Sequence, residues 1–246
     1  MTTFVAVHGA FTGGWYWARV RSLLRANGHD VFTPSLTGAG ERSHLLSRDV
    51  TLALHVEDIL RLLRYEDLRD VVLVGHSYGG MVITAVADQA PERLARLVYL
   101  DAAYPVNGQN AAGGFAEGTG DRLETLSSTG PEDLSWLLPP LPLAAYGVTD
   151  PADIAWIGDR RVSHPLATLH EPIALRGAVS LPRTYIRCTR RQGLIDLFGA
   201  DPLLPMYERA VADGLTIVDI DAGHDAMVTA PREVADALID VSRDAA

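Results

Sequence analysis

One serine in this sequence stands where a reactive nucleophile would have to be. Gly75-His76-Ser77-Tyr78-Gly79 fits the pattern G-x-S-x-G and directly follows the apolar run Val71–Val74. This run predicts a buried strand, and the nearly all-apolar run Met81–Ala87 after Gly80 predicts a buried helix. A serine on so tight a strand-to-helix turn needs glycines on both sides, because larger residues would clash there. The pattern therefore predicts Ser77 as a nucleophile exposed at the carboxyl end of the strand.

A serine hydroxyl is a poor nucleophile without a base within hydrogen-bond reach. His224 is the best-placed histidine, because it follows the apolar run Leu215–Ile220 in a short loop. This loop is expected at the same carboxyl edge of a parallel sheet as Ser77, where ligands bind in open α/β sheets. His8 and His76 adjoin glycines inside turns, and we expect structural roles for both. No role is assigned to the five remaining histidines, which are His29, His44, His55, His164 and His170.

Attack on a carbonyl also needs backbone N–H groups that bind the oxyanion. The residue after the nucleophile, Tyr78, is expected to supply one amide. The second is expected from the loop His8-Gly9-Ala10-Phe11, which follows the apolar run Phe4–Val7, and Ala10 is the best candidate. Gly9 would let the backbone of this loop approach the substrate closely.

Short apolar runs alternate with helical patterns along the chain, which is typical of a mostly parallel sheet with crossover helices. The predicted strands are Phe4–Val7, Val31–Thr33, Val71–Val74, Leu97–Leu100, Thr184–Cys188 and Leu215–Ile220. The predicted helices cover Trp15–Ala26, Thr51–Leu63, Met81–Ala87, Pro202–Asp213 and a last one from Pro231.

The stretch from about 102 to 181 differs from the rest, since it is rich in Gly, Pro and Ala and lacks strand periodicity. Short helical pieces are expected around Pro131–Leu138 and Pro151–Asp159. We expect a small, mainly helical cap inserted into a single domain that covers residues 1–246. Apolar cap residues suggest a pocket for an aromatic or medium-chain group, and they are Trp136, Leu137, Leu138, Tyr146, Trp156 and Ile157.

The composition excludes several classes of function. With 21 basic against 31 acidic residues the net charge is −10, which argues against nucleic acid and anionic membranes as partners. The chain has no lysine, so Schiff-base and pyridoxal-phosphate chemistry is excluded. No cluster of Cys and His has metal-ligand spacing, and neither a metal nor a cofactor is expected. One cysteine and no apolar run long enough to span a membrane favour a cytoplasmic protein, whose oligomeric state the sequence does not define.

These residues together resemble an α/β-hydrolase of the group that contains plant methyl-salicylate esterases, hydroxynitrile lyases and bacterial carboxylesterases. The motifs that carry the resemblance are His8-Gly9-Ala10 with Gly13-Gly14-Trp15, the run from Gly75 to Gly80, and Gly223-His224. The resemblance extends along essentially the whole chain and is weakest in the cap. It implies the α/β-hydrolase fold, a Ser77/His224 pair, and the amides of Ala10 and Tyr78 as the oxyanion hole.

The acidic member of a catalytic triad departs from this family's pattern. The acid usually follows the strand that is Thr184–Cys188 here, but the next five residues contain no carboxylate. Asp101 is the favoured replacement, because it ends the strand Leu97–Leu100 and some α/β-hydrolases carry the acid there. Asp196 lies a few residues beyond the usual position and is the second candidate. A water molecule or another residue is the third possibility.

A nucleophilic serine disfavours haloalkane dehalogenases and epoxide hydrolases, which resemble this fold but use aspartate. Hydroxynitrile lyases of the group rely on a lysine beside the histidine, whereas Asp225 follows His224 here. We therefore expect a carboxylesterase that cleaves small apolar or aromatic esters through an acyl-enzyme on Ser77, with lactone or amide hydrolysis as related possibilities. The alternative from another class is a ligand-binding protein that keeps the fold and barely turns over.

Overall fold

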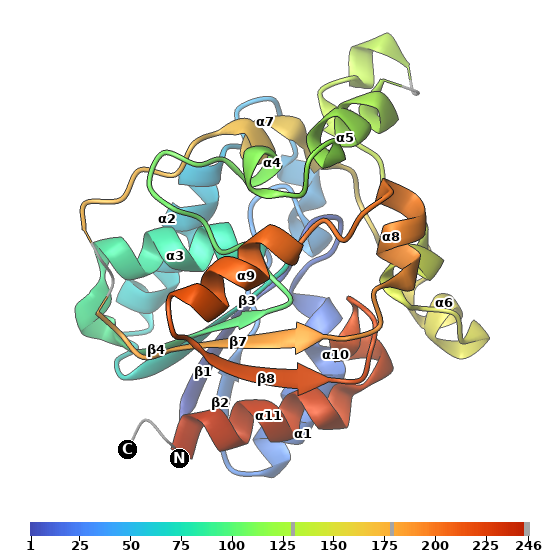
Figure 1. Ribbon diagram of the computed structural model, residues 1–246. Coiled ribbons are helices and arrows are strands. Elements are labelled where there is room, and N and C mark those ends of the chain that lie inside the picture. Colours follow the sequence, from blue (N-terminus) through green and yellow to red (C-terminus); the bar gives the residue numbers. More distant parts are fainter. Residues whose placement is uncertain (129–130, 178–179, 244–246) are drawn as a thin grey trace.

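The computed structural model describes residues 1–128, 131–177 and 180–243. A central sheet of six strands, all paired in parallel, has the order β2-β1-β3-β4-β7-β8 (Figure 1). This sheet confirms the predicted fold class, and each of the six predicted strands is present. Their bounds are β1 (Thr3–Val7), β2 (Asp30–Phe32), β3 (Val71–His76), β4 (Leu94–Leu100), β7 (Arg183–Cys188) and β8 (Thr216–Ile220).

Helices cover both faces of this sheet (Figure 1). On one face lie α1 (Ala18–Ala26) and α11 (Pro231–Arg243). On the other lie α2 (Leu52–Tyr65), α3 (Gly79–Gln89) and α9 (Leu204–Ala212). Among the described residues, no helix is both long enough and apolar enough to cross a membrane.

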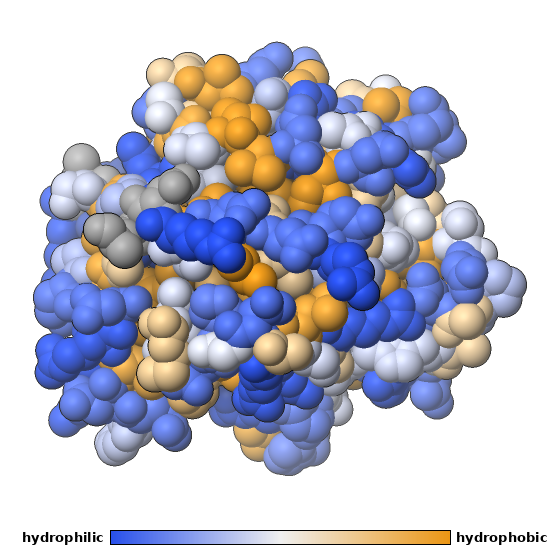
Figure 2. All heavy atoms as spheres, turned by 90° about the horizontal axis from the view of Figure 1, so that it is seen from below, coloured by the Kyte–Doolittle hydropathy of each residue, from blue (hydrophilic) through white to orange (hydrophobic). Residues whose placement is uncertain are grey.

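The alternation of side chains along each strand supplies both layers of the core. In β3, Val72 and Val74 pack toward α1 and α11, whereas Val71 and Leu73 pack toward α2 and α3. Both sets are buried, which explains why these strands are continuous apolar runs in the sequence. Hydrophilic side chains cover most of the molecular face in Figure 2, with apolar patches between them.

The chain between β4 and β7 forms small elements outside the central sheet. Its helices are α4 (Ala111–Gly114), α5 (Thr119–Ser127), α6 (Pro151–Ile157), α7 (Leu166–His170) and the short 3₁₀ helices η4 (Glu132–Leu134) and η5 (Leu143–Tyr146). Two antiparallel strands, β5 (Leu137–Leu138) and β6 (His164–Pro165), pair within it. In Figure 1, α4, α5 and α7 lie together at the top of the view, above α9, whereas α6 lies on the right, past the ends of β7 and β8.

Two expected helices differ from the structure. The piece expected around Pro131–Leu138 is a single 3₁₀ turn followed by β5, because Pro139 favours an extended backbone at the residue before it. The helix expected over Trp15–Ala26 begins as a 3₁₀ helix, η1 (Gly14–Trp17), before α1.

Outside the stretch 102–181, four further short elements of the described residues were not expected from the sequence. They are η2 (Gly40–Leu45), η3 (Pro91–Arg93), α8 (Gln192–Phe198) and α10 (Ala226–Thr229). Each is too short to show a clear helical period of apolar residues, which is the signal that identifies helices in a sequence.

Gly80 makes the tightest helix contact near the serine turn and offers a test of the fold. A Cβ atom there would lie 1.9 Å from the carbonyl oxygen of Ala103, whereas a Cβ at Gly120 in α5 would meet only ordinary contacts from 3.6 Å. We expect Gly80→Ala to lower the free energy of unfolding by about 2–3 kcal/mol, since backbone must move. Gly120→Ala should be neutral or stabilise by up to about 1 kcal/mol, because alanine favours helix. Urea unfolding measures both, and equal effects would contradict the close approach.

Candidate active site

The sharp turn between β3 and α3 holds Ser77 in a backbone conformation that few side chains adopt. Its φ angle is +53°, in the left-handed region. The carbonyl of Ser77 accepts hydrogen bonds from the amides of Gly80 at 3.1 Å and Ala103 at 2.9 Å. These bonds fix the turn, and they leave the half-buried Ser77 on the wall of a cavity.

The loop after β1 packs directly against the serine. A Cβ atom on Gly9 would lie 2.8 Å from the Cβ of Ser77, so only glycine allows this approach. The next residues, Ala10 and Phe11, line the same cavity as Ser77 and Tyr78. Phe11 has a φ angle of +68°, and its carbonyl accepts a hydrogen bond from the amide of Val162 at 2.9 Å. The structure thus brings both predicted oxyanion-hole residues, Ala10 and Tyr78, to the serine.

The candidate base and its favoured acid meet at the carboxyl edge of the sheet. The Nδ1 atom of His224 donates to Oδ2 of Asp101 at 2.6 Å, and both side chains are buried. This bond holds the neutral ring with Nε2 unprotonated, the state that can accept a proton. His224 lines the cavity that also contains Ser77.

The second candidate acid is far less suited to a role at this histidine. Asp196 lies on α8 and is exposed, and its carboxylate accepts from the side-chain amide of Gln192 at 2.7 Å. No contact with His224 is found among the described residues. The geometry therefore favours Asp101 over Asp196.

Asp101 has two further partners that the sequence did not indicate. Its Oδ2 also accepts from Nη1 of Arg191 at 2.5 Å, and its Oδ1 accepts from the amide of Cys188 at 3.3 Å. Burial alone would raise the pKa of Asp101, but the Arg191 guanidinium and the His224 ring outweigh it and hold this pKa at about 2. Arg191 pairs in turn with Asp201. Asp101 therefore stays ionised although it is fully buried.

A network of histidines behind Tyr78 was also not expected. The hydroxyl of Tyr78 donates to Nδ1 of His55 at 2.9 Å, while Nε2 of His55 donates to the carbonyl of Thr37 at 3.0 Å. His164 packs edge-on against the Tyr78 ring and hydrogen-bonds to Thr168. His55 lies on the apolar face of the predicted helix, a signal that could have identified it as buried. These contacts anchor Tyr78, the residue that directly follows Ser77.

The cavity at Ser77 is mainly apolar. Its wall comes largely from the chain between β4 and β7 and from the segment after β7, and it includes Phe115, Leu123, Leu138, Leu141, Tyr146, Leu169, Leu194, Phe198 and Leu203. A smaller cavity of about 20 Å³ also touches Ser77 and His224, and its polar lining includes Thr12, Arg161 and Asp225. That volume is enough for about one water molecule.

Only part of the apolar set expected to form the pocket lines it. Leu138 and Tyr146 do, whereas Trp136, Leu137, Trp156 and Ile157 do not belong to this wall. The Trp156 ring instead lies near the guanidinium groups of Arg19 and Arg160, each 4.7 Å from its centroid. Cation–π attraction to these arginines explains why Trp156 packs onto the main body and not into the cavity.

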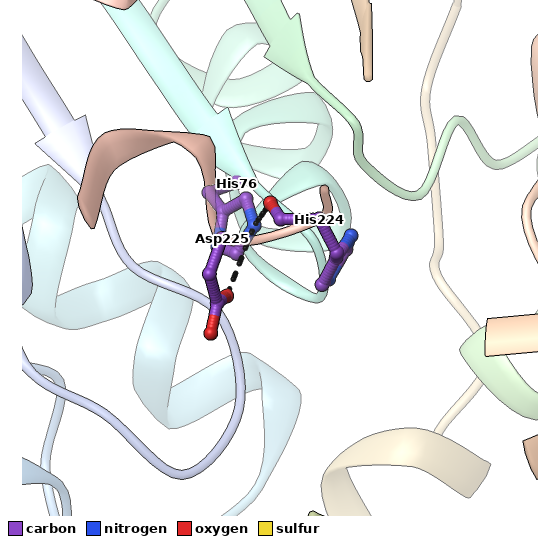
Figure 3. Close-up of side chains that lie close together, drawn as sticks. All are labelled: His76, His224 and Asp225. Atoms are coloured by element: carbon purple, nitrogen blue, oxygen red, sulfur yellow. Dashed lines mark hydrogen bonds and ion pairs between the residues drawn. The ribbon is translucent and has the colours of Figure 1, made fainter. Parts of the chain in front are cut away.

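One group of side chains among the described residues could in principle hold a metal ion. The candidate ligand atoms of His76, His224 and Asp225 lie within 4.8 Å of one another. Nε2 of His76 already donates to the carbonyl of His224 at 3.0 Å, and Asp225 accepts from the hydroxyl of Tyr16. The rings of His76 and His224 lie against each other with their centroids 4.6 Å apart (Figure 3). We interpret His76 and Asp225 as supports of the His224 loop, since ligation would break these bonds.

Burial sets the charge of these two supports. Burial and the neighbouring His224 lower the pKa of His76 well below its usual range, so this ring is neutral. Burial raises the pKa of Asp225, although the His224 ring and the Tyr16 hydroxyl oppose the rise.

Comparison with known proteins identifies the family. Residues 4–237 match the alpha/beta hydrolase family. A carbendazim-hydrolyzing esterase of Nocardioides sp. (strain SG-4G) is 37% identical, covering 97% of this chain and 98% of that protein. Salicylic acid-binding protein 2 of Nicotiana tabacum is 25% identical over 97% of this chain and 96% of its own length.

A solved structure agrees with this assignment. An extracellular alpha/beta-hydrolase from a Paenibacillus species superimposes with a TM-score of 0.82 and 23% identity, covering 98% of both chains. That likeness shows the fold, and the match over nearly the whole length shows the family. The chain belongs to the alpha/beta hydrolase family, and it is a hydrolase.

Proposed function

We propose that this protein is a carboxylesterase that cleaves small apolar or aromatic esters through an acyl-enzyme on Ser77. The observation that carries the proposal is the buried 2.6 Å hydrogen bond from His224 to Asp101 beside a serine held in a strained turn. One relative supports the reaction class, since it is named a carbendazim-hydrolyzing esterase, and the name of the salicylic acid-binding protein agrees with a small aromatic ligand.

In the proposed reaction, Ser77 attacks the ester carbonyl while Nε2 of His224 takes the hydroxyl proton. The amides of Ala10 and Tyr78 bind the oxyanion, and Asp101 stabilises the protonated ring. His224 then returns the proton to the leaving alcohol, which departs from the acyl-enzyme. Water, activated by the same ring, releases the acid. The cavity beside Thr12 and Asp225 has room for this water.

We further propose that residues 1–246 form one hydrolase domain in which the segment of about 102–181 is a cap. Its contribution to the wall of the cavity supports this assignment, because Phe115, Leu123 and Leu169 all lie within it. These side chains would bind the apolar part of the ester, while Ser77 lies on the sheet edge below.

The first test is covalent labelling of the serine. After incubation with a fluorophosphonate, intact mass should show one adduct on the wild type and none on Ser77→Ala, because only an activated serine reacts. Circular dichroism of both proteins controls for folding. A folded wild type without an adduct would contradict the proposal and favour a ligand-binding protein.

The second test identifies the acid. We expect Asp101→Asn to lower kcat by a factor on the order of 10⁴, because the asparagine cannot stabilise the protonated ring or hold its tautomer. Asp196→Asn is the matched control and should leave kcat for an aryl acetate unchanged. A large loss in the control, or none in either variant, would refute the assignment of Asp101.

The third test concerns the apolar wall. Phe115→Ala should raise KM for an aryl ester about tenfold with kcat nearly unchanged, because it removes apolar contact made equally in ground and transition states. Trp156→Phe should leave KM unchanged, because Trp156 packs away from the cavity. Steady-state kinetics on both variants measures these effects. A raised KM in Trp156→Phe with an unchanged KM in Phe115→Ala would show that the wrong residues have been assigned to the wall of the cavity.

A further inference from the structure

We propose that Asp101, Arg191 and Asp201 form an ion triad whose single net negative charge stabilises the protonated ring of His224. In this arrangement Arg191 and Asp201 are positioning residues that act through Asp101. The inference rests on the proposed function, since it concerns the same histidine. It also accounts for an arginine in the segment where the resembling hydrolases carry their acid.

The guanidinium of Arg191 donates hydrogen bonds to both carboxylates of the triad. Nη1 of Arg191 donates to Oδ2 of Asp101 at 2.5 Å, and this is the same oxygen that accepts from His224. Nε and Nη2 of Arg191 donate to the two oxygens of Asp201 at 2.9 and 2.6 Å. Such a two-point contact fixes the plane of the guanidinium, and thereby the direction of its bond to Asp101.

All three side chains are shielded from water, so their charges act strongly on one another. The exposed fractions are 2% for Asp101, 7% for Arg191 and 11% for Asp201. An Asp101–Arg191 pair alone would be neutral and would leave His224 little negative charge to face. Asp201 restores one negative charge to the group. The protonated ring then completes a neutral cluster of four groups, which is the favourable arrangement in a buried site.

Other titratable groups surround His224 and Asp101, and most keep one charge state. Burial lowers the pKa of His76 and raises those of Tyr146, Tyr185 and Cys188, so these four are neutral near pH 7. Arg161, in the small cavity, is a fixed positive charge. Asp225 has its pKa raised by burial and can change charge in acid. Because all six are unchanged in the variants below, differences between variants report on the triad.

The experiment follows the ring of His224 by NMR as a function of pH in four proteins. These are the wild type, Arg191→Gln, Asp201→Asn and the double variant, with the His224 signal assigned by its loss in His224→Asn. Asp201→Asn removes negative charge, so the midpoint of the His224 titration should move to lower pH. Arg191→Gln removes positive charge, so the midpoint should move to higher pH. The double variant leaves Asp101 as the one charge and should return toward the wild type.

Kinetics supply a second measurement on the same proteins. We expect Asp201→Asn to lower kcat about tenfold with KM unchanged, since the protonated ring is stabilised less in the transition state. The acidic limb of kcat/KM against pH should move in the same directions as the NMR midpoints. Thermal unfolding of each variant controls for folding, and the double variant remains informative if Arg191→Gln alone does not fold.

Two outcomes would overturn the triad. In one, the midpoint of the His224 titration moves in the same direction in both single variants. In the other, the midpoint moves in neither. A merely structural role of Arg191 and Asp201 does not predict midpoint shifts of opposite sign. The titration of the His224 ring needs no turnover, so it tests the effect of the triad on His224 independently of the proposed reaction. If the wild type shows no hydrolysis dependent on Ser77 while the midpoints shift as expected, the proposed function fails and the triad stands.

Discussion

The parallel pairing of β3 with β4 is the constraint on which the site of this protein depends. Their register places His76 opposite Leu100, so the residues that follow, Ser77 and Asp101, leave the sheet side by side. Hydrogen bonds continue beyond the strands, since the amide of Ser77 donates to the carbonyl of Leu100 and the carbonyl of Ser77 accepts from the amide of Ala103. Ser77 and Asp101 both have positive φ angles, of 53° and 44°. Their unusual conformations are maintained because neighbouring turns hold each other.

The chain between β4 and β7 does more than cover this edge. The amide of Val162 donates to the carbonyl of Phe11 in the loop after β1, and the amide of Asp225 donates to the carbonyl of Tyr146. The segment is thus bonded to the loop beside the serine and to the loop that carries His224. It also packs His164 against the Tyr78 ring. Any displacement of this segment would therefore move the loops that carry Phe11 and His224 together with the apolar wall of the cavity.

Sequence reasoning predicted the six strands, and it predicted that Ser77 and His224 lie at one edge of the sheet, because both predictions depend on local pattern. Continuous apolar runs identify buried parallel strands, and residues at their carboxyl ends must converge. The choice between Asp101 and Asp196 depended instead on which side chain reaches His224 in space. Likewise, nothing in the sequence separated Trp156, which packs near two arginines, from Leu138, which lines the cavity. Contacts across the fold decide such cases.

The partners of Asp101 show the same limit more clearly. Arg191 and Asp201 are ten residues apart, and α8 lies between them. Their approach to Asp101 depends on how this short helix turns after β7. The sequence showed that the expected carboxylate is missing after β7, which departs from the family pattern. It did not show that Arg191 contacts Asp101 and Asp201. The segment without a carboxylate supplies the cation that faces the carboxylate of the neighbouring strand.

The lone thiol of the chain lies against this same carboxylate. Cys188 is fully buried, its amide donates to Asp101, and burial raises the pKa of its thiol well above the usual range. A thiol reagent can therefore reach Cys188 only when the structure around the end of β7 opens locally. The rate of modification of Cys188 thus reports local opening near Asp101, without any introduced probe. The protein thus carries a natural thiol probe of local opening in its buried core.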